Sequence, residues 1–301
     1  MSKASICVVI PVRNGAQVLA GTLAALRRQS VTISIVVVDD GSSDGSAEVV
    51  KTEPDLSLVQ HQQSLGRAAA RNAGAKLAES EWLLFLDCDR CPLSDNFIAA
   101  HLSTAQASAG SMGAVEAEGS GFWPAYQRHS AAQGAESQPV GLWQFSSANF
   151  LIRRAQFEAL GGFDERYRHY GFEDRDFYAR LLATGQHLLW APKARAKHTA
   201  RLSLAEVWLK MAQCGQYTAP RFRGCHPKAY GDSRYARLDV HLHSLLMPLA
   251  RLTPLLQHTL PFGEYLLQRR WLPFAWRRSL ALAYSAAAFL GGGLRAAKAR
   301  A

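Results

Sequence analysis

The stretches ICVVIPVRN at residues 6–14 and ISIVVVDDGSSDG at residues 33–45 decide the fold of this chain. Each begins with a β-branched run that is too short for a helix and ends in turn-forming residues, as is typical of buried parallel strands. Residues 17–28, between them, carry apolar side chains at helical spacing and predict an amphipathic helix. Strand, helix and strand form a βαβ unit, so the sequence predicts an α/β fold with a Rossmann-like, mostly parallel sheet flanked by helices.

The same kind of pattern extends through the first two hundred residues. Further helices are predicted over 45–52, 68–79, 154–160 and 173–184, and further strands over 57–61, 82–86, 148–152, 188–191 and 194–198. Residues 103–145 differ, because Ser, Ala, Gly and Gln dominate and no period is visible. We expect a functional loop or a mobile lid there.

Charge divides the chain into two parts. Residues 1–200 hold 19 Lys and Arg against 20 Asp and Glu, whereas residues 201–301 hold 15 against 4. We expect an α/β domain over 1–200 and a basic, mostly helical C-terminal extension over 201–301. A neutral domain with a basic, Leu-rich extension favours an anionic membrane surface over nucleic acid as a partner. A solvated basic face without any partner is the alternative.

Composition excludes several classes of protein. Hydrophobic residues make up 48% and charged residues 19% of the 301 residues, which excludes a mainly disordered chain. The five cysteines are scattered, which fits reduced thiols better than a disulfide framework. The N-terminal apolar run is short and has no small-residue cleavage site, so we expect no signal peptide and a cytoplasmic protein.

Polar residues follow the predicted strands where each strand ends, at 11–14, 39–42, 66–74 and 87–89. Ligands of open α/β sheets bind at the carboxyl ends of the parallel strands, so we expect these segments to form one site. Asp87 and Asp89 are two positions apart and therefore point to the same side of an extended segment. Two carboxylates suit Mg²⁺ or Mn²⁺ that substrate phosphates also bind. The alternatives are a solvated turn for this pair and an Asx turn before a helix for 39–42.

With these motifs in this order, the chain resembles the family 2 glycosyltransferases of the GT-A fold. The resemblance rests on VVIPVRNGA, VVVDDGSSDGS and LGRAAARNAGAKLAESEWLLFLDCD, and farther on ANFLIRRAQFEALGGFDERYRHYGFEDRDFYARLLATG. It covers about residues 5–200 and implies a nucleotide-sugar half over about 1–102 and an acceptor half over about 103–200. It further implies an inverting hexosyltransferase of polysaccharide biosynthesis. Such an enzyme moves one sugar from a nucleotide-diphosphate sugar, with a UDP-sugar favoured, to a glycan or lipid-linked acceptor.

The resemblance assigns a role to each matching residue. The base and ribose would be held by Pro11, Val12, Arg13, Asn14, Asp39 and Asp40, and the ribose and diphosphate by Arg67, Arg71, Asn72 and Asp87. A divalent metal, Mn²⁺ or Mg²⁺, would be bound by Asp89 with Asp87 and His198. Asp174 would be the general base, and Glu173 would hydrogen-bond the acceptor. Single displacement needs such a base and an electrophile that stabilises the departing diphosphate.

Other interpretations remain open at several positions. The acidic run at 173–176 also fits N-terminal helix capping, and His198 also fits a structural histidine. Arg13 stands where the family often has an aromatic residue, and Arg90 and Cys91 follow the carboxylate pair in place of acidic or small residues.

Competing functions are less well supported by the sequence. Cys88 and Cys91 form a CxxC, but no second pair at matching spacing supports a zinc or redox site. The Gln-x-x-Arg-Trp run of processive members is absent, which predicts transfer of a single sugar. The alternatives on the same fold are a nucleotidyltransferase and a non-catalytic nucleotide-sugar binding module. The former lacks support because no Gly-rich phosphate loop with a Lys follows the first strand.

The extension alternates apolar runs with arginines, in HSLLMPLARLTPLLQH, EYLLQRRWLPFAWRR and SLALAYSAAAFLGGGL. The last run is shorter than the roughly twenty residues that span a bilayer. Trp271 and Trp276 lie among arginines, as interfacial anchors do. We expect peripheral attachment to the cytoplasmic face of the inner membrane and no binding of nucleic acid. Helices packed on the enzyme or on a second subunit are the alternative.

Overall fold

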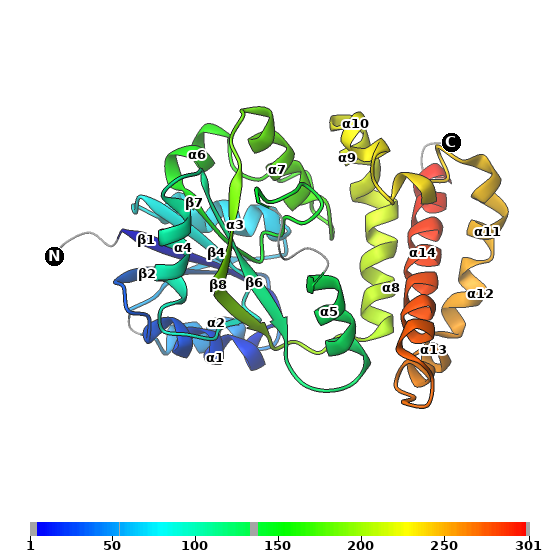
Figure 1. The fold of residues 1–301 in the computed structure, drawn as a ribbon, viewed down its shortest axis with the longest axis horizontal. Helices are drawn as coiled ribbons and strands as arrows, with labels where there is room; N and C mark the ends of the chain where they lie inside the picture. The colour runs from blue at the N-terminus through cyan, green and yellow to red at the C-terminus, as the bar shows by residue number, and fades with distance from the viewer. Residues whose placement is uncertain (1–4, 54, 133–137, 299–301) are drawn as a thin grey trace. The chain divides into compact units, whose positions relative to one another are not determined.

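The apolar runs of the sequence form the centre of an eight-stranded sheet in the computed structural model, which describes residues 5–53, 55–132 and 138–298 (Figure 1). The strand order is β3-β2-β1-β4-β7-β6-β8-β5. The strands are β1 (Ile6–Val12), β2 (Ile33–Asp40), β3 (Ser57–His61), β4 (Trp82–Leu86), β5 (Arg90–Pro92), β6 (Gly110–Ala117), β7 (Asn149–Arg153) and β8 (Leu188–His198). Four neighbouring pairs are parallel, and the β4–β7, β6–β7 and β5–β8 pairs are antiparallel. The predicted α/β fold on a mostly parallel sheet is confirmed.

Alternation along the strands creates two apolar layers. Cys7 and Val9 of β1 point to one face, where they join the core formed with α3 (Arg67–Leu77), α6 (Arg154–Ala159) and α7 (Glu173–Ala183). Ile6, Val8 and Ile10 point to the other face, which is covered by α1 (Ala16–Arg27), α2 (Ser46–Lys51) and α4 (Phe97–Ala105). Side chains of a strand alternate between faces, and a sheet buried on both sides therefore reads as one continuous apolar run.

The expected loop or lid over 103–145 is wrong for most of its length. This stretch contains β6, an inner strand of the sheet, and α5 (Phe122–Ala132), while residues 133–137 lie outside the described part of the chain. The strand was not predicted because it contains glycine where strands usually carry β-branched residues. A Cβ on Gly110 would lie 2.0 Å from the backbone oxygen of Leu151. The close approach of the neighbouring backbone excludes the β-branched residues that usually mark a strand.

Two further differences concern strands. The two short strands predicted over 188–191 and 194–198 are one strand, β8, whose pairing with β6 shifts register between Gly113 and Ala114. An irregularity of this kind interrupts the alternation on which the prediction relied. The short strand β5 and the helix α4 were not predicted.

The described chain forms two compact units. The sheet unit comprises Met1–Glu118, Gln127–Arg168 and Phe177–Ala200, and the helical unit comprises Gly119–Tyr126, His169–Asp176 and Arg201–Ala301. A division at residue 200 into a catalytic domain and an extension stays a prediction.

The helical unit contains the helices expected after residue 201. They are α8 (Leu204–Gln213), a π-helix (Cys214–Thr218), α9 (Ala219–Cys225), α10 (Pro227–Gly231), α11 (Met247–Arg251), α12 (Thr253–His258), α13 (Leu260–Leu267) and α14 (Phe274–Lys298), with 3₁₀ turns at Ala236–Leu238 and Ser244–Leu246. Among the described residues one helix, at Phe274–Ala297, is long and apolar enough to cross a membrane by length and composition. Half of its apolar window is buried inside the protein, which is also the pattern of a core helix.

Candidate active site

The loops after β1 and β2 are joined by hydrogen bonds. Asn14 adopts a positive φ of 53°, its backbone N–H donates to the Ser42 hydroxyl at 2.9 Å, and its side-chain oxygen accepts from the backbone N–H of Ser43 at 2.9 Å. Pro11 and Val12 lie at the end of β1 beside β2 in register, and Arg13 is exposed. The structure therefore brings residues 11–14 and 39–43 together at the carboxyl ends of two parallel strands.

Asp39 and Asp40 end β2 and are both buried. Asp39 accepts a hydrogen bond from the backbone N–H of Ser42 at 3.0 Å. Asp40 accepts four: from the His61 ring, the Ser64 hydroxyl, and the backbone N–H groups of Leu65 and Gly66, at 2.7–3.0 Å. Burial raises the pKa of Asp40, but these donors outweigh it and leave the pKa below its ordinary value. Asp40 thus holds residues 64–66, the loop that leads into α3, through hydrogen bonds.

Helix α3 supplies three of the predicted residues. Arg67 begins the helix after Gly66, and Arg71 is almost fully buried. The side chain of Asn72 donates to the backbone oxygen of Phe163 at 2.8 Å and to Glu165 at 2.9 Å, and accepts from the backbone N–H of Phe163 at 2.9 Å. Asn72 therefore pairs with the segment around Phe163 much as a backbone amide would.

Arg71 and Asp87 form an ion pair at the end of β4. The Arg71 guanidinium donates to Asp87 Oδ1 at 2.8 Å, and the backbone N–H of Asp87 donates to Ala148 at 3.1 Å. Burial raises the pKa of Asp87, but the charges of Arg71 and Arg90 counter it and hold the pKa below its ordinary value. Asp87 is therefore ionised at neutral pH and kept in place by a buried cation.

Asp89 and His198 meet where β4 and β8 end. His198 Nε2 lies 3.1 Å from Asp89 Oδ2, and Arg90 donates to Asp89 Oδ1 at 2.7 Å. The amide nitrogen of Gln127 lies 2.5 Å from His198 Nδ1, which therefore accepts and leaves the ring hydrogen on Nε2, facing Asp89. Metal binding by Nε2 would require this hydrogen to move to Nδ1 and Gln127 to present its oxygen instead.

The predicted metal ligands are only partly assembled. Within the described part of the chain, no group of three or more His, Cys, Asp and Glu side chains is placed to hold a metal ion. Asp89 and His198 are in contact, whereas Asp87 is turned to Arg71. A carboxylate and an imidazole suit Mn²⁺ when diphosphate oxygens and water supply the other ligands, so the residues fit a metal that arrives with its substrate.

The acidic segment of residues 173–176 opens α7 and belongs to the helical unit. Asp174 is partly exposed and accepts from the backbone N–H of Arg175 at 2.8 Å and from its guanidinium at 2.9 Å. Glu173 is buried. Asp176 is also buried, and its Oδ1 accepts from His226 Nε2 at 2.9 Å.

The backbone before this segment is held in an uncommon conformation. Gly171 and Phe172 both have positive φ, of 93° and 67°. For Phe172 this region is unfavourable, at roughly 1–3 kcal/mol. Its buried ring packs on Phe222 and Tyr235, each with ring centroids 5.1 Å away, and these contacts hold the turn.

Sequence reasoning missed Gln127, Phe172 and His226. Gln127 falls within the stretch taken for a loop, and Phe172 gives no sequence signal for a left-handed conformation. His226 is distant in sequence from Asp176, and no spacing rule joins the two. Only the folded chain shows that the helices after residue 201 hold the acidic segment.

Comparisons with known proteins concern the family and the fold. Residues 7–170 match the family model described as "Glycosyl transferase family 2". The pre-mycofactocin glycosyltransferase of Mycobacterium tuberculosis is 30% identical over 230 residues, which are 73% of this chain and 48% of that protein. The succinoglycan biosynthesis protein ExoA of Rhizobium meliloti is 24% identical over 238 residues, 74% of this chain and 71% of that protein. The chain spans about half the length of the mycobacterial relatives.

A solved structure supports the fold. The mannosyltransferase PcManGT from Pyrobaculum calidifontis, in complex with GDP-Man and Mn²⁺, superposes with a TM-score of 0.62 at 18% identity. The match covers 98% of this chain and 88% of that one. At this identity the likeness concerns the fold, so the sheet with its flanking helices is of the GT-A type.

Proposed function

Because this chain belongs to glycosyl transferase family 2, we propose that it transfers one sugar from a nucleotide-diphosphate sugar to a glycan or lipid-linked acceptor. The reaction is an inverting single displacement, and the donor is a UDP-sugar. The observation that carries the proposal is the contact of Asp89 with His198 beside the Arg71–Asp87 ion pair, at the ends of β4 and β8.

The donor binds at the carboxyl ends of β1, β2 and β4. Residues 11–14 and Asp39 line this edge and receive the base and ribose, while Arg67 adds a positive charge at the start of α3 for the diphosphate. Asp40 and Asn72 support the site from behind, since their polar atoms already accept or donate within the chain. Asp87, kept anionic by Arg71, is left to accept from ribose hydroxyls through its second oxygen.

Asp89 and His198 would hold a divalent metal, for which Mn²⁺ is the first candidate because the similar PcManGT is in complex with it. Such an ion, when bound, offsets negative charge on the departing nucleoside diphosphate. Gln127 orients the ring of His198, and its amide oxygen would accept from Nδ1–H when Nε2 binds the metal. Arg90 donates to the other oxygen of Asp89 and orients that carboxylate.

Asp174 accepts the proton of the acceptor hydroxyl, and Glu173 hydrogen-bonds the acceptor. Asp174 is the partly exposed carboxylate of the acidic segment, whereas Glu173 and Asp176 are buried. Hydrogen bonds from Arg175 to both of its oxygens hold the side chain in one orientation, and a second lone pair on either oxygen can accept from an incoming hydroxyl. A general base of this kind contributes about 10²- to 10⁴-fold to the rate.

The acceptor is a polysaccharide precursor, and the enzyme works at the cytoplasmic face of a membrane. The likeness to a succinoglycan biosynthesis protein supports a glycan product. The basic helical unit, with 15 Lys and Arg against 4 Asp and Glu after residue 200, supports attachment to an anionic surface.

The test is nucleotide binding and turnover in matched variants. We expect UDP with Mn²⁺ to raise the thermal unfolding temperature, and we expect Asp89→Ala to abolish that rise because it removes the carboxylate ligand. Asp174→Asn should keep the rise but lower kcat by about 10²- to 10⁴-fold. Asp95→Asn, at an exposed carboxylate of the sheet unit, serves as the control for both measurements.

Each part of the proposal can fail separately. Stabilisation by a different nucleotide would replace the UDP-sugar donor with another base. Binding without turnover by any sugar donor would instead favour a binding module that has lost catalysis. Asp174→Asn with wild-type kcat would remove Asp174 from the role of base.

A further inference from the structure

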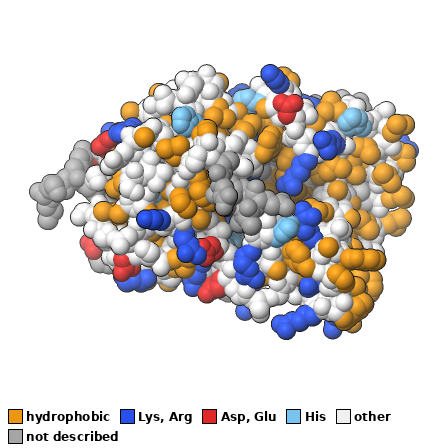
Figure 2. Space-filling view, in the orientation of Figure 1, with side chains coloured by type: hydrophobic (Ala, Val, Ile, Leu, Met, Phe, Trp, Pro, Cys, Tyr) orange, Lys and Arg blue, Asp and Glu red, His pale blue; other side chains and the backbone are white. Residues whose placement is uncertain are grey.

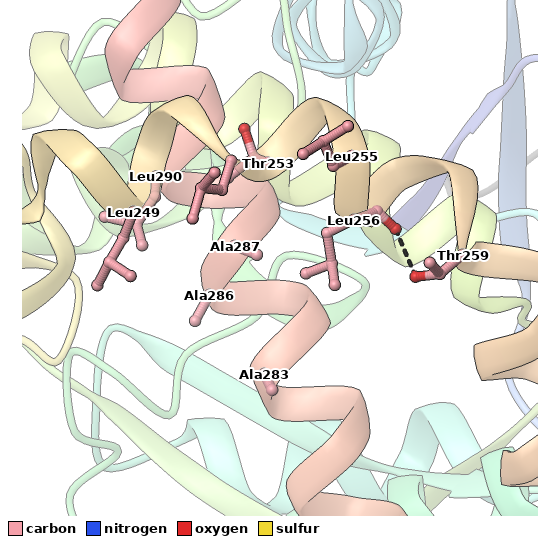
Figure 3. A pocket seen from close by; sticks show the side chains of 10 residues that line it. Leu249, Thr253, Leu255, Leu256, Thr259, Ala283, Ala286, Ala287 and Leu290 are labelled. Atoms are coloured by element: carbon pink, nitrogen blue, oxygen red, sulfur yellow. Dashed lines mark hydrogen bonds between the residues drawn. The ribbon is translucent and has the colours of Figure 1, made fainter.

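A groove opens between α11–α12 and α14 in the helical unit (Figure 3). Its volume is about 490 Å³. Leucines of α11 and α12 form one wall, and the small side chains Ala283, Ala286 and Ala287 of α14 form the other. A pocket of this size lies within the range that holds a small ligand.

The two walls of the groove pack closely at two glycines, Gly291 and Gly263. A Cβ on Gly291 would lie 2.4 Å from Thr253 Oγ1, and a Cβ on Gly263 would lie 2.8 Å from the Tyr284 ring. At these two points the helices meet directly. Between them, prolines at the starts of α11, α12 and α13 divide that wall into short helices, and alanines leave space on α14.

The groove offers no polar group to a ligand. The Thr253 hydroxyl donates to the backbone oxygen of Ala250 at 2.8 Å. The Thr259 hydroxyl lies 2.7 Å from both the backbone oxygen of Leu256 and the Tyr284 hydroxyl. With both threonines satisfied inside the protein, the remaining wall is hydrocarbon, and hydrocarbon is the ligand chemistry that it fits.

The surface around the groove is unusually apolar. Figure 2 shows hydrophobic side chains gathered over the region of α11 to α13. Ten large hydrophobic side chains between residues 242 and 276 are exposed, among them Leu245 at 91% and Trp271 and Trp276 at 73% each. Exposed apolar patches of this kind mark surfaces that bind a partner.

Charge identifies the partner as an anionic bilayer. Residues 240–298 contain seven Lys and Arg but a single acidic residue, Glu264. That carboxylate faces inward, where it accepts from Trp123, the backbone of Leu204, and Gln268. Arginine pairs at 269–270 and 277–278 flank the two exposed tryptophans, the combination that sits at a membrane interface.

We propose that the α11–α12–α14 groove binds the hydrocarbon chain of a lipid in an anionic bilayer, with Trp271, Trp276 and the neighbouring arginines at the headgroup level. The inference rests on the membrane attachment proposed above and not on the transfer reaction. In this proposal the groove adds a hydrophobic contact with a lipid chain to the electrostatic attachment. An attachment by charge alone would leave the groove empty and would be lost in salt.

The test uses the full chain with vesicles of phosphatidylcholine, alone or mixed with phosphatidylglycerol that carries a photoreactive acyl chain. We expect sedimentation with the anionic vesicles only, and crosslinks within residues 247–259 and 283–290. Ala286→Leu fills the groove without changing charge. It should remove the crosslinks and weaken binding by about four-fold for each methylene excluded. Ala297→Leu, outside the groove, should match the wild type.

Three results would overturn the inference. Wild-type crosslinking in Ala286→Leu, with its fold verified by circular dichroism, would show that the groove does not hold the chain. Binding that 0.5 M salt removes completely, without crosslinks, would leave charge attachment but no lipid site. Absence of binding to any vesicle would also end the proposed attachment, while nucleotide stabilisation in solution would still test the transferase independently.

Discussion

At Asp40 and Asn72, hydrogen bonds inside the chain decide what each side chain can offer a substrate. Asp40 accepts four and Asn72 takes part in three, all from other parts of the sheet unit. The sequence predicted the strand that Asp40 follows and the helix that carries Asn72, because both elements follow from the apolar pattern. It could not show which of their polar atoms are already used, since the partners come from loops distant in sequence.

His101 should make the protein sensitive to mild acid. The ring is fully buried in the sheet unit between Ser111 and Asn149, at 2.9 Å from each, and burial lowers its pKa from 6.5 to about 4. The unfolded chain therefore takes up the proton first, so stability is full above pH 6.5 and falls as the pH drops towards 4. The loss amounts to roughly 3 kcal/mol.

Thermal unfolding of the wild type and of His101→Gln between pH 7.5 and 4 measures this effect. The variant should be less stable at pH 7.5, because it loses packing, and should show a flatter fall with acid. Parallel curves for the two proteins would mean that other groups cause the acid sensitivity.

At the scale of elements, glycines in helices predict opposite responses to the same substitution. A Cβ on Gly74, in α3, would lie 2.4 Å from Val9 of the sheet, whereas a Cβ on Gly21, in α1, would meet nothing within 4 Å. Gly74→Ala should destabilise by about 1–3 kcal/mol through overpacking. Gly21→Ala should stabilise by up to about 1 kcal/mol, since alanine is the better helix former. Chemical denaturation measures both, and a stabilised Gly74→Ala would contradict the close contact of α3 with β1.

Element prediction from the sequence succeeded where burial was two-sided and failed where glycine or a register shift intervened. The strand at 82–86 has the predicted bounds, because its continuous buried apolar run leaves few alternatives. Strand β6 was missed, because Gly110 is required by the backbone of β7 and not by any local preference. Gln127 was not recognised beside His198, because it lies in the stretch that was predicted as a loop.

At the scale of the whole molecule, the helical unit draws on three separate stretches of chain. Within it, Trp123 donates to Glu264 at 3.1 Å. The ring of Phe122 packs on Phe274, and the ring of Phe172 packs on Phe222. A chain ending at residue 200 would expose the buried side chains of Phe122, Trp123 and Phe172.

We therefore expect the fragment 1–200 to aggregate or to unfold without cooperativity. Size-exclusion chromatography and thermal unfolding, beside the full chain in the same buffer, measure this. A soluble fragment that unfolds cooperatively and responds to nucleotide would support a catalytic domain that ends at residue 200.

The turn at Gly171 and Phe172 has a consequence for the order in which the chain is made. Its packing partners Phe222 and Tyr235, and His226 that holds Asp176, leave the ribosome about fifty to sixty residues after it. At an elongation rate of about 5–20 residues per second this delay lasts roughly 3 to 12 s. The acidic segment of a nascent chain therefore lacks these contacts until residues 222–235 have been made.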